Sequence, residues 1–135
     1  MADLVVERIG DRVRVGSGSP FEPRMGYARA VRVGAHVAVS GTLGREADGS
    51  YAPDVAGQTR RALAIIRAAL EALGARIDDV VRTRLFVRDA TQFEAIAVVH
   101  GELFGEIRPA CTLVEVSRLV DDAALIEIEA DAIVG

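Results

Sequence analysis

Acidic side chains alternate with apolar ones near the end of the chain, where Glu127, Glu129 and Asp131 are each separated by one aliphatic residue. A carboxylate held in a pocket can act as a general acid or base and can position water for attack on a small molecule. The same alternation is typical of a strand face that water covers, which is the more common arrangement. Two interpretations therefore remain open: a solvated strand face, or a face on which at least one carboxylate lines a pocket.

Other reactive side chains are few. Cys111 is the only cysteine, which rules out a disulfide within the chain and permits a reducing compartment. His36 and His100 lie far apart and share no metal-ligand spacing. His100 falls at the edge of an apolar helical stripe, where a histidine is more often packed than catalytic. The sequence therefore predicts no metal site and no cofactor.

All 16 basic residues are arginine, and 20 acidic residues give a net charge of −4. Without lysine, the chain cannot form a Schiff base through a side-chain amine or build a phosphate loop of the Walker type. The acidic balance gives no attraction to nucleic acid or anionic membranes, and no apolar run approaches the ~18 residues of a membrane span. These features predict a single cytoplasmic domain over residues 1–135, with no nucleic-acid or membrane partner.

The three acids belong to a predicted strand at residues 125–134, whose other face is apolar. We expect this strand to pair with one at 108–116, which begins at Pro109 and carries Cys111. Further strands are predicted at 4–9, 12–15, 27–33, 36–40 and 79–87, and residues 21–26 are expected to be irregular.

Two helices are predicted from their apolar periodicity. Residues 54–73 form the first, with Gln58 as a local capping group, and capping-box spacing at Thr91 begins the second, which runs to residue 104. Strands mixed with two long helices indicate an α+β domain, in which both helices pack on one face of a mixed sheet.

Two strands carry features that suit a ligand. Gly41 follows Ser40 at a strand end, where a glycine lets the backbone approach a ligand closely, although a β-bulge explains it more simply. Arg82, Arg84 and Arg88 alternate along the strand at 79–87. They line either a functional surface or an exposed sheet edge that charges protect from aggregation.

Six segments, taken in this order, resemble the Rid family, the reactive-intermediate deaminases that are also called YjgF-like proteins. They are Gly-Tyr-Ala-Arg-Ala-Val-Arg-Val-Gly at 26–34, Val-Ser-Gly-Thr at 39–42, Gln-Thr-Arg-Arg-Ala-Leu at 58–63, Asp-Asp-Val-Val-Arg-Thr at 78–83, Arg-Pro-Ala-x-x-x-Val-Glu-Val at 108–116 and Ile-Glu-Ile-Glu-Ala at 126–130. The resemblance covers about residues 26–135. It implies a chorismate-mutase-like fold, assembled as a homotrimer with sites in clefts between subunits.

The resemblance also implies a reaction. Active Rid proteins hydrolyse enamines and imines to a keto acid and ammonia. An arginine holds the substrate carboxylate, a glutamate positions and activates water, and a tyrosine and backbone groups shape the pocket. By position, the glutamate corresponds to Glu127 and the tyrosine to Tyr27, and the strand-end Ser40 and Gly41 match as well.

The family's arginine does not match, because Cys111 stands at its place. Loss of a desolvated arginine–carboxylate contact costs on the order of 2–5 kcal/mol, which corresponds to a factor of roughly tens to thousands. We therefore expect weak or no activity on the usual 2-imino acids. Cys111 is expected to lie beside Glu127, whose negative charge disfavours a thiolate, so a packing or pocket-lining role is favoured over a nucleophile. Arg84 or Arg29 remains as a guanidinium that reaches the site from another direction.

Two functions are open. The first is an enamine/imine hydrolase at an intersubunit pocket, favoured by the retained tyrosine and glutamate. The second is a non-catalytic trimer that binds or senses a small metabolite, favoured by the lost arginine. Ribonuclease action is disfavoured by the acidic balance and the two distant histidines. The expected site residues are Glu127 as the catalytic group and Tyr27, Ser40, Gly41, Cys111 and Arg84 as substrate-binding groups.

Overall fold

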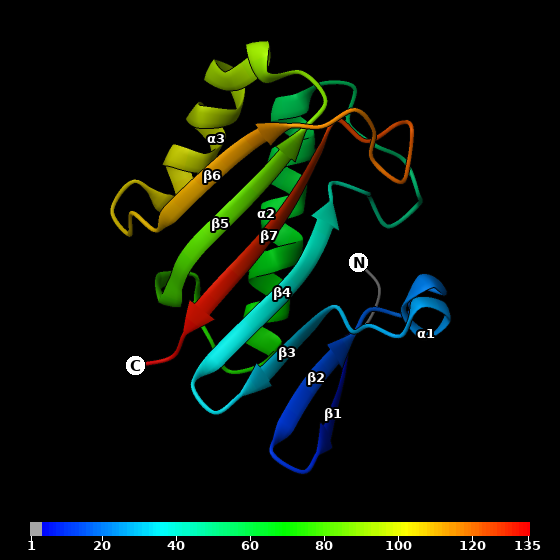
Figure 1. Ribbon diagram of the computed structural model, residues 1–135, viewed down its shortest axis with the longest axis vertical. Coiled ribbons are helices and arrows are strands. Elements are labelled where there is room, and N and C mark those ends of the chain that lie inside the picture. The colour runs from blue at the N-terminus through cyan, green and yellow to red at the C-terminus, as the bar shows by residue number, and fades with distance from the viewer. Residues whose placement is uncertain (1–3) are drawn as a thin grey trace.

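In the part of the chain that the structure describes, seven strands form one mixed sheet in the order β1-β2-β3-β4-β7-β5-β6 (Figure 1). The computed structural model describes residues 4–135. The strands are β1 (Val5–Ile9), β2 (Arg12–Gly16), β3 (Ala30–Val33), β4 (His36–Leu43), β5 (Val80–Val87), β6 (Ala110–Glu115) and β7 (Ile126–Ile133). All neighbouring strands are antiparallel except β5 and β6, which are parallel.

Two long helices, α2 (Val55–Ala72) and α3 (Phe93–Phe104), cover one face of the sheet and leave the other face open (Figure 1). The carboxylate of Asp54 caps α2 by accepting a hydrogen bond from the backbone of Gly57 at 3.0 Å. Gly74, at a φ of 77°, follows the end of α2. The α+β class and the placement of both predicted helices on one sheet face are confirmed.

The central strand β7 shows the predicted alternation. Its apolar side chains are buried beneath the helices, whereas Glu127, Glu129 and Asp131 are half-buried on the open face. The buried set comprises Ile126, Ile128, Ala130 and Ala132. Because β7 pairs with β4 on one side and β5 on the other, the backbone beneath the acids is held from both sides.

The predicted pairing of the last two strands is wrong. Among the described strands, β6 pairs with β5 alone, and β5 separates it from β7. The cause is α3, which connects β5 to β6, because a strand–helix–strand unit brings two parallel strands together. β5 is thus an interior strand, so its arginines do not protect a sheet edge.

Two local features also differ from expectation. A third, short helix, α1 (Phe21–Met25), replaces the irregular chain expected at 21–26. Pro23 lies in its first turn, where the missing N–H costs little, and Gly26 ends it at a φ of 80°. The capping box at Thr91 does not form, because Asp89 accepts a hydrogen bond from the Thr91 backbone and caps a short 3₁₀ helix before α3.

Among residues 4–135, no helix is both long enough and apolar enough to span a membrane.

Candidate functional site

Glu127 lies on the open face of the sheet, opposite Leu43 of β4 and Phe86 of β5. Its side chain extends over Gly41. A Cβ atom at that glycine would stand 2.9 Å from Cδ and 3.1 Å from Oε2 of Glu127. The pairing of β4 with β7 shifts register between Val39 and Thr42, so Gly41 also lies in a β-bulge. The bulge and the close approach therefore occur together, and the group that approaches is the carboxylate of Glu127.

Arg29 is the basic residue next to Gly41 and Glu127, and we refer to these three residues as the Glu127 corner. Its Nη2 donates a hydrogen bond to the carbonyl oxygen of Gly41 at 2.5 Å, and its backbone oxygen accepts one from the Ser40 N–H at 3.0 Å. Its Nε is buried without a hydrogen-bond partner within residues 4–135. Glu127 forms no ion pair with Arg29 or with any other described residue. The guanidinium of Arg29 and the carboxylate of Glu127 therefore both lie beside Gly41 without forming an ion pair with each other.

The charges of the corner perturb one another. Burial raises the pKa of Glu127; Arg29 opposes this shift and Glu129 adds to it. Burial lowers the pKa of the Arg29 guanidinium, while Tyr27, Glu22 and Glu127 counteract that effect. A carboxylate whose pKa is raised exchanges protons more readily near neutral pH, which suits a general acid or base.

The matched residues gather around this pair. The hydroxyl of Ser40 donates to the Ala28 carbonyl at 2.7 Å, which fixes the chain between Tyr27 and Arg29 against β4. Tyr27 follows α1, and its backbone N–H donates to the Glu22 carbonyl at 2.9 Å. The structure thus brings together four expected site residues, Tyr27, Ser40, Gly41 and Glu127, and adds Arg29 to them.

Glu22 was not expected at the site and carries no sequence motif that marks it. Only 7% of this residue is exposed. Its carboxylate accepts hydrogen bonds from the Ser17 N–H at 3.1 Å and from the Ser17 hydroxyl. It therefore supports the charge of Arg29 electrostatically without forming an ion pair with it.

The loops that border the site are tied together by two polar residues. Tyr51 donates a hydrogen bond to Asp121 at 3.0 Å, and burial together with Asp121 raises the pKa of Tyr51 to about 12, with a smaller contribution from Glu127. Gln58 is not a local cap. Its Nε2 donates to the carbonyls of Ala52 and Ala123, at 3.0 and 3.1 Å. The same side chain accepts a hydrogen bond from the backbone that leads into β7.

Cys111 is not a neighbour of Glu127 within one chain. It pairs in register with Thr83, whose side chain is buried on the helix-covered side, so Cys111 lies on the opposite face of the sheet from Glu127. Two strand spacings and three residues separate Cys111 from Glu127, which places their Cα atoms about 14 Å apart. The expected contact between them is therefore wrong for a single protomer.

Arg84 is already engaged. Its Nη1 lies 3.0 Å from Glu129 Oε1 and 3.4 Å from Asp131 Oδ2. The register of β5 against β7 places Arg84 directly opposite Glu129 and one pair away from Glu127. Of the two guanidinium groups considered from the sequence, the structure brings Arg29 rather than Arg84 next to the Gly41 carbonyl below Glu127.

The two histidines lie on different faces of the sheet. His36 is exposed and stands 3.7 Å from Asp131 on the open side. His100 is 3.0 Å from the Thr83 hydroxyl and stacks near Phe104, with 4.6 Å between ring centroids. Burial lowers the pKa of His100, and its contacts with Thr83 and Phe104 agree with the expected packing role. No group of three or more His, Cys, Asp or Glu residues in the described chain is arranged to hold a metal ion.

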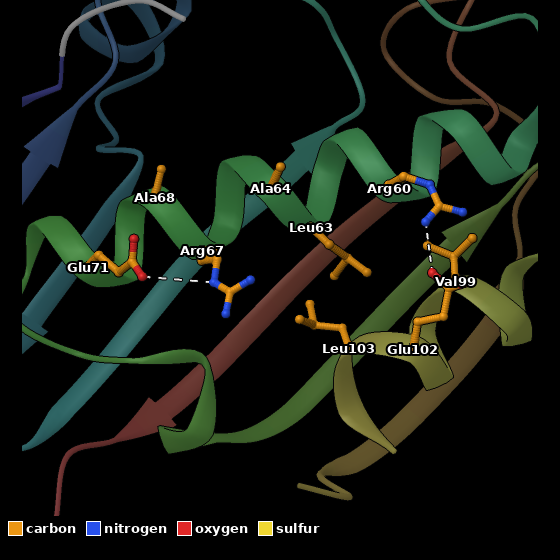
Figure 2. Close-up of a pocket in the computed structure, with 9 residues that line it drawn as sticks. All are labelled: Arg60, Leu63, Ala64, Arg67, Ala68, Glu71, Val99, Glu102 and Leu103. Carbon is orange, nitrogen blue, oxygen red and sulfur yellow. Dashed lines mark hydrogen bonds and ion pairs between the residues drawn. The ribbon is translucent and has the colours of Figure 1, made fainter. Parts of the chain in front are cut away.

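Two hollows on the described surface lie away from these residues. One is a groove between α2 and α3 with Leu63, Val99 and Leu103 at its floor (Figure 2). An ion pair of 2.8 Å between Arg60 and Glu102 crosses the same groove. The other hollow lies between the β1–β2 hairpin and the end of α2. Neither contains a residue of the Glu127 corner.

Comparison with known proteins agrees with this fold. The family model described as Endoribonuclease L-PSP matches residues 18–134. A Streptomyces coelicolor protein, SCO2049, is 37% identical over 120 residues, which cover 88% of this chain and 90% of that protein. The 2-iminobutanoate/2-iminopropanoate deaminase of Salmonella typhimurium is 36% identical over 111 residues, covering 79% of this chain and 86% of the deaminase.

Among solved structures, Rv2704 from Mycobacterium tuberculosis, a member of the YjgF/YER057c/UK114 family, superposes with a TM-score of 0.85. It is 46% identical in sequence, and the match covers 91% of this chain and 99% of Rv2704. By sequence and by fold, the chain belongs to the YjgF family, which is also called the Rid family.

Proposed function

We propose that this protein is an enamine/imine hydrolase of the deaminase type, in which Glu127 is the catalytic base. One observation carries the proposal: a half-buried carboxylate with a raised pKa extends over a glycine and has no ion pair with the described residues. Such a carboxylate is free to hold a water molecule. The deaminase of S. typhimurium, 36% identical, supports the same reaction class.

The chemistry needs one group that moves a proton in both directions. Glu127 takes a proton from water as the oxygen adds to the imine carbon, which gives a carbinolamine. The protonated carboxyl then returns that proton to the nitrogen. The carbinolamine hydroxyl then gives its proton to Glu127, which passes it to the departing nitrogen, so that the carbon–nitrogen bond breaks, ammonia leaves and the carbonyl of the keto acid forms. A pKa raised toward neutrality serves both the uptake and the release.

The proposal includes a homotrimer that closes the site. The open sheet face carries exposed Val33, Val114 and Ile133, and no element of the described chain covers it. A sheet with helices on one side gains stability when a second copy covers the other side. A neighbouring copy against this face would turn the surroundings of Glu127 into a pocket. A cytoplasmic location fits, because Cys111 is an exposed free thiol.

Ribonuclease action, named in the family description, is not supported by these residues. The two histidines lie on opposite sheet faces, and the open face carries the carboxylates of β7. Negative charge there repels a phosphate backbone.

The experiment measures hydrolysis of 2-iminobutanoate, generated in situ from 2-aminobutanoate by an amino-acid oxidase. The wild-type protein should release ammonia faster than the spontaneous reaction. Glu127→Gln should fall to the spontaneous rate while light scattering still reports the trimer mass. A monomeric mass for the wild-type protein at micromolar concentration would contradict the shared site. Binding of 2-oxobutanoate without any turnover would favour the metabolite-binding alternative.

A further inference from the structure

A carboxylate substrate needs a cation in the site, and Cys111 does not provide one. Among the described residues, the guanidinium beside Glu127 is that of Arg29, which donates to the Gly41 carbonyl. Arg84 lies on the same sheet face but is bound by two carboxylates, at 3.0 and 3.4 Å. A guanidinium that already donates to two carboxylates has little capacity left to bind a third.

Arg29 has the opposite arrangement. One nitrogen is fixed by the Gly41 carbonyl, whereas Nε is buried and has no hydrogen-bond partner within residues 4–135. A buried N–H donor without an acceptor is unusual, and a shift of the guanidinium onto ligand oxygens is one way to satisfy it. Glu22 stabilises the positive charge from nearby, but the Ser17 backbone and hydroxyl occupy its oxygens. The charge of Arg29 is therefore maintained while donor capacity is left over.

We propose that Arg29 binds the substrate carboxylate, so that this chain acts on 2-imino acids through an arginine in the segment before β3 rather than through one at position 111. This inference rests on the proposed function for the position of the site, but the binding step does not require catalysis. With the carboxylate on Arg29, the adjacent imine carbon would lie between the guanidinium and Glu127, where a water held by Glu127 can attack. A planar guanidinium is suited to a carboxylate by its paired donors.

The test measures binding of 2-oxobutanoate, the keto-acid product, by isothermal titration. Butan-2-one, which lacks the carboxylate, is the neutral probe. The wild-type protein should bind 2-oxobutanoate at least tenfold more tightly than butan-2-one, and Arg29→Gln should remove that preference. Arg60→Gln is the matched control, because Arg60 is exposed on α2 and pairs with Glu102 on the far side of the sheet. It should bind as the wild-type protein does.

Arg29 also supports the Gly41 carbonyl, so the thermal midpoint and trimer mass of each variant are measured first. Arg29→Lys keeps the charge and loses the planar pair of donors, and it should show an intermediate affinity. An NMR titration of the wild-type protein needs no variant: 2-oxobutanoate should shift the Arg29 Nε–H signal, whereas butan-2-one should not. An unmoved Arg29 signal at saturating 2-oxobutanoate would overturn the inference.

The two proposals fail in different ways. If the wild-type protein hydrolyses 2-iminobutanoate and Arg29→Gln leaves KM and 2-oxobutanoate affinity unchanged, Arg29 is not the anchor and Glu127 keeps its role. If 2-oxobutanoate binding depends on Arg29 but no imine is hydrolysed, the anchor stands and the catalytic proposal falls. Loss of binding in Arg84→Gln with retention in Arg29→Gln would assign the anchor to Arg84 and overturn the inference.

Discussion

Replacing Gly41 by alanine tests whether the space above this glycine matters for catalysis. The new methyl group would stand 2.9 Å from Cδ and 3.1 Å from Oε2 of Glu127, closer than ordinary van der Waals contact. Gly41 does not have a positive φ, so alanine fits its backbone without strain. The conflict is confined to the end of a flexible side chain, and Glu127 must therefore move.

The size of the effect follows from these distances. Restoring ordinary contact displaces the carboxylate by about 0.5–1 Å, and a misplacement of ~1 Å costs roughly a hundredfold in rate. We expect kcat for imine hydrolysis to fall by about 10- to 100-fold. A shifted rotamer costs about 0.5–1.5 kcal/mol, and the lower entropy of the unfolded alanine chain offsets about 0.4–1 kcal/mol of it. The free energy of unfolding should therefore change by less than about 1 kcal/mol.

The assay is hydrolysis of 2-iminobutanoate, with thermal unfolding measured on the same samples. Gly101→Ala is the matched control, because a Cβ atom there meets nothing within 4 Å and Gly101 lies inside α3. It should raise stability by about 0.5–1 kcal/mol and leave kcat unchanged. A Gly41→Ala protein that keeps more than half of the wild-type kcat, or that loses activity only by unfolding, would contradict a role for this contact in placing Glu127.

Three more substitutions have defined outcomes. Burial raises the pKa of Glu127, so the folded state retains the proton to higher pH than the unfolded state, and stability falls as pH rises through that window. Glu127→Gln should therefore raise the melting temperature near neutral pH, and melting curves should show no gain well below the unfolded value of 4.5. Gln58→Ala removes three hydrogen bonds and should cost about 2–4 kcal/mol in urea unfolding, whereas a loss under 0.5 kcal/mol would deny its role as a tie between loops. Cys111→Arg should leave turnover of 2-iminobutanoate near the wild-type level, because Cys111 lies on the other sheet face and Arg29 supplies the anchor, whereas an increase of about tenfold or more would contradict Arg29 as the anchor.

The regular helices and strands were predictable because their apolar residues recur with a clear helical or strand period. The alternation in β7 reflects a strand with one face in the core and one outside it, and the spacing of Leu63, Ile66 and Leu70 reflects a helix packed on a sheet. The short helix α1 was missed because five residues hold too little periodicity to distinguish a helix turn from a loop.

Contacts between distant segments were harder to predict. The strands β6 and β7 are consecutive along the chain, which suggests that they pair. In the sheet, however, β5 lies between them, and the sequence does not indicate this. The position of β5 between β6 and β7 determines where Cys111 and Arg84 lie relative to Glu127. It separates Cys111 from Glu127, and it aligns Arg84 with Glu129, which leaves Arg29 as the guanidinium next to Glu127 that has no carboxylate partner within residues 4–135. A choice between two arginines depends on strand register, which a single sequence does not specify.

The pH dependence of kcat/KM for 2-iminobutanoate hydrolysis reports the protonation of Glu127 in the free enzyme. If Glu127 is the base, the wild-type rate should rise with a slope of one on a logarithmic scale as Glu127 loses its proton, with an apparent pKa above 4.5 because burial raises the pKa of this carboxyl. Glu127→Gln should show no such limb and should follow the spontaneous reaction. A Glu127→Gln protein that reproduces the wild-type profile would contradict the assignment of Glu127 as the catalytic base.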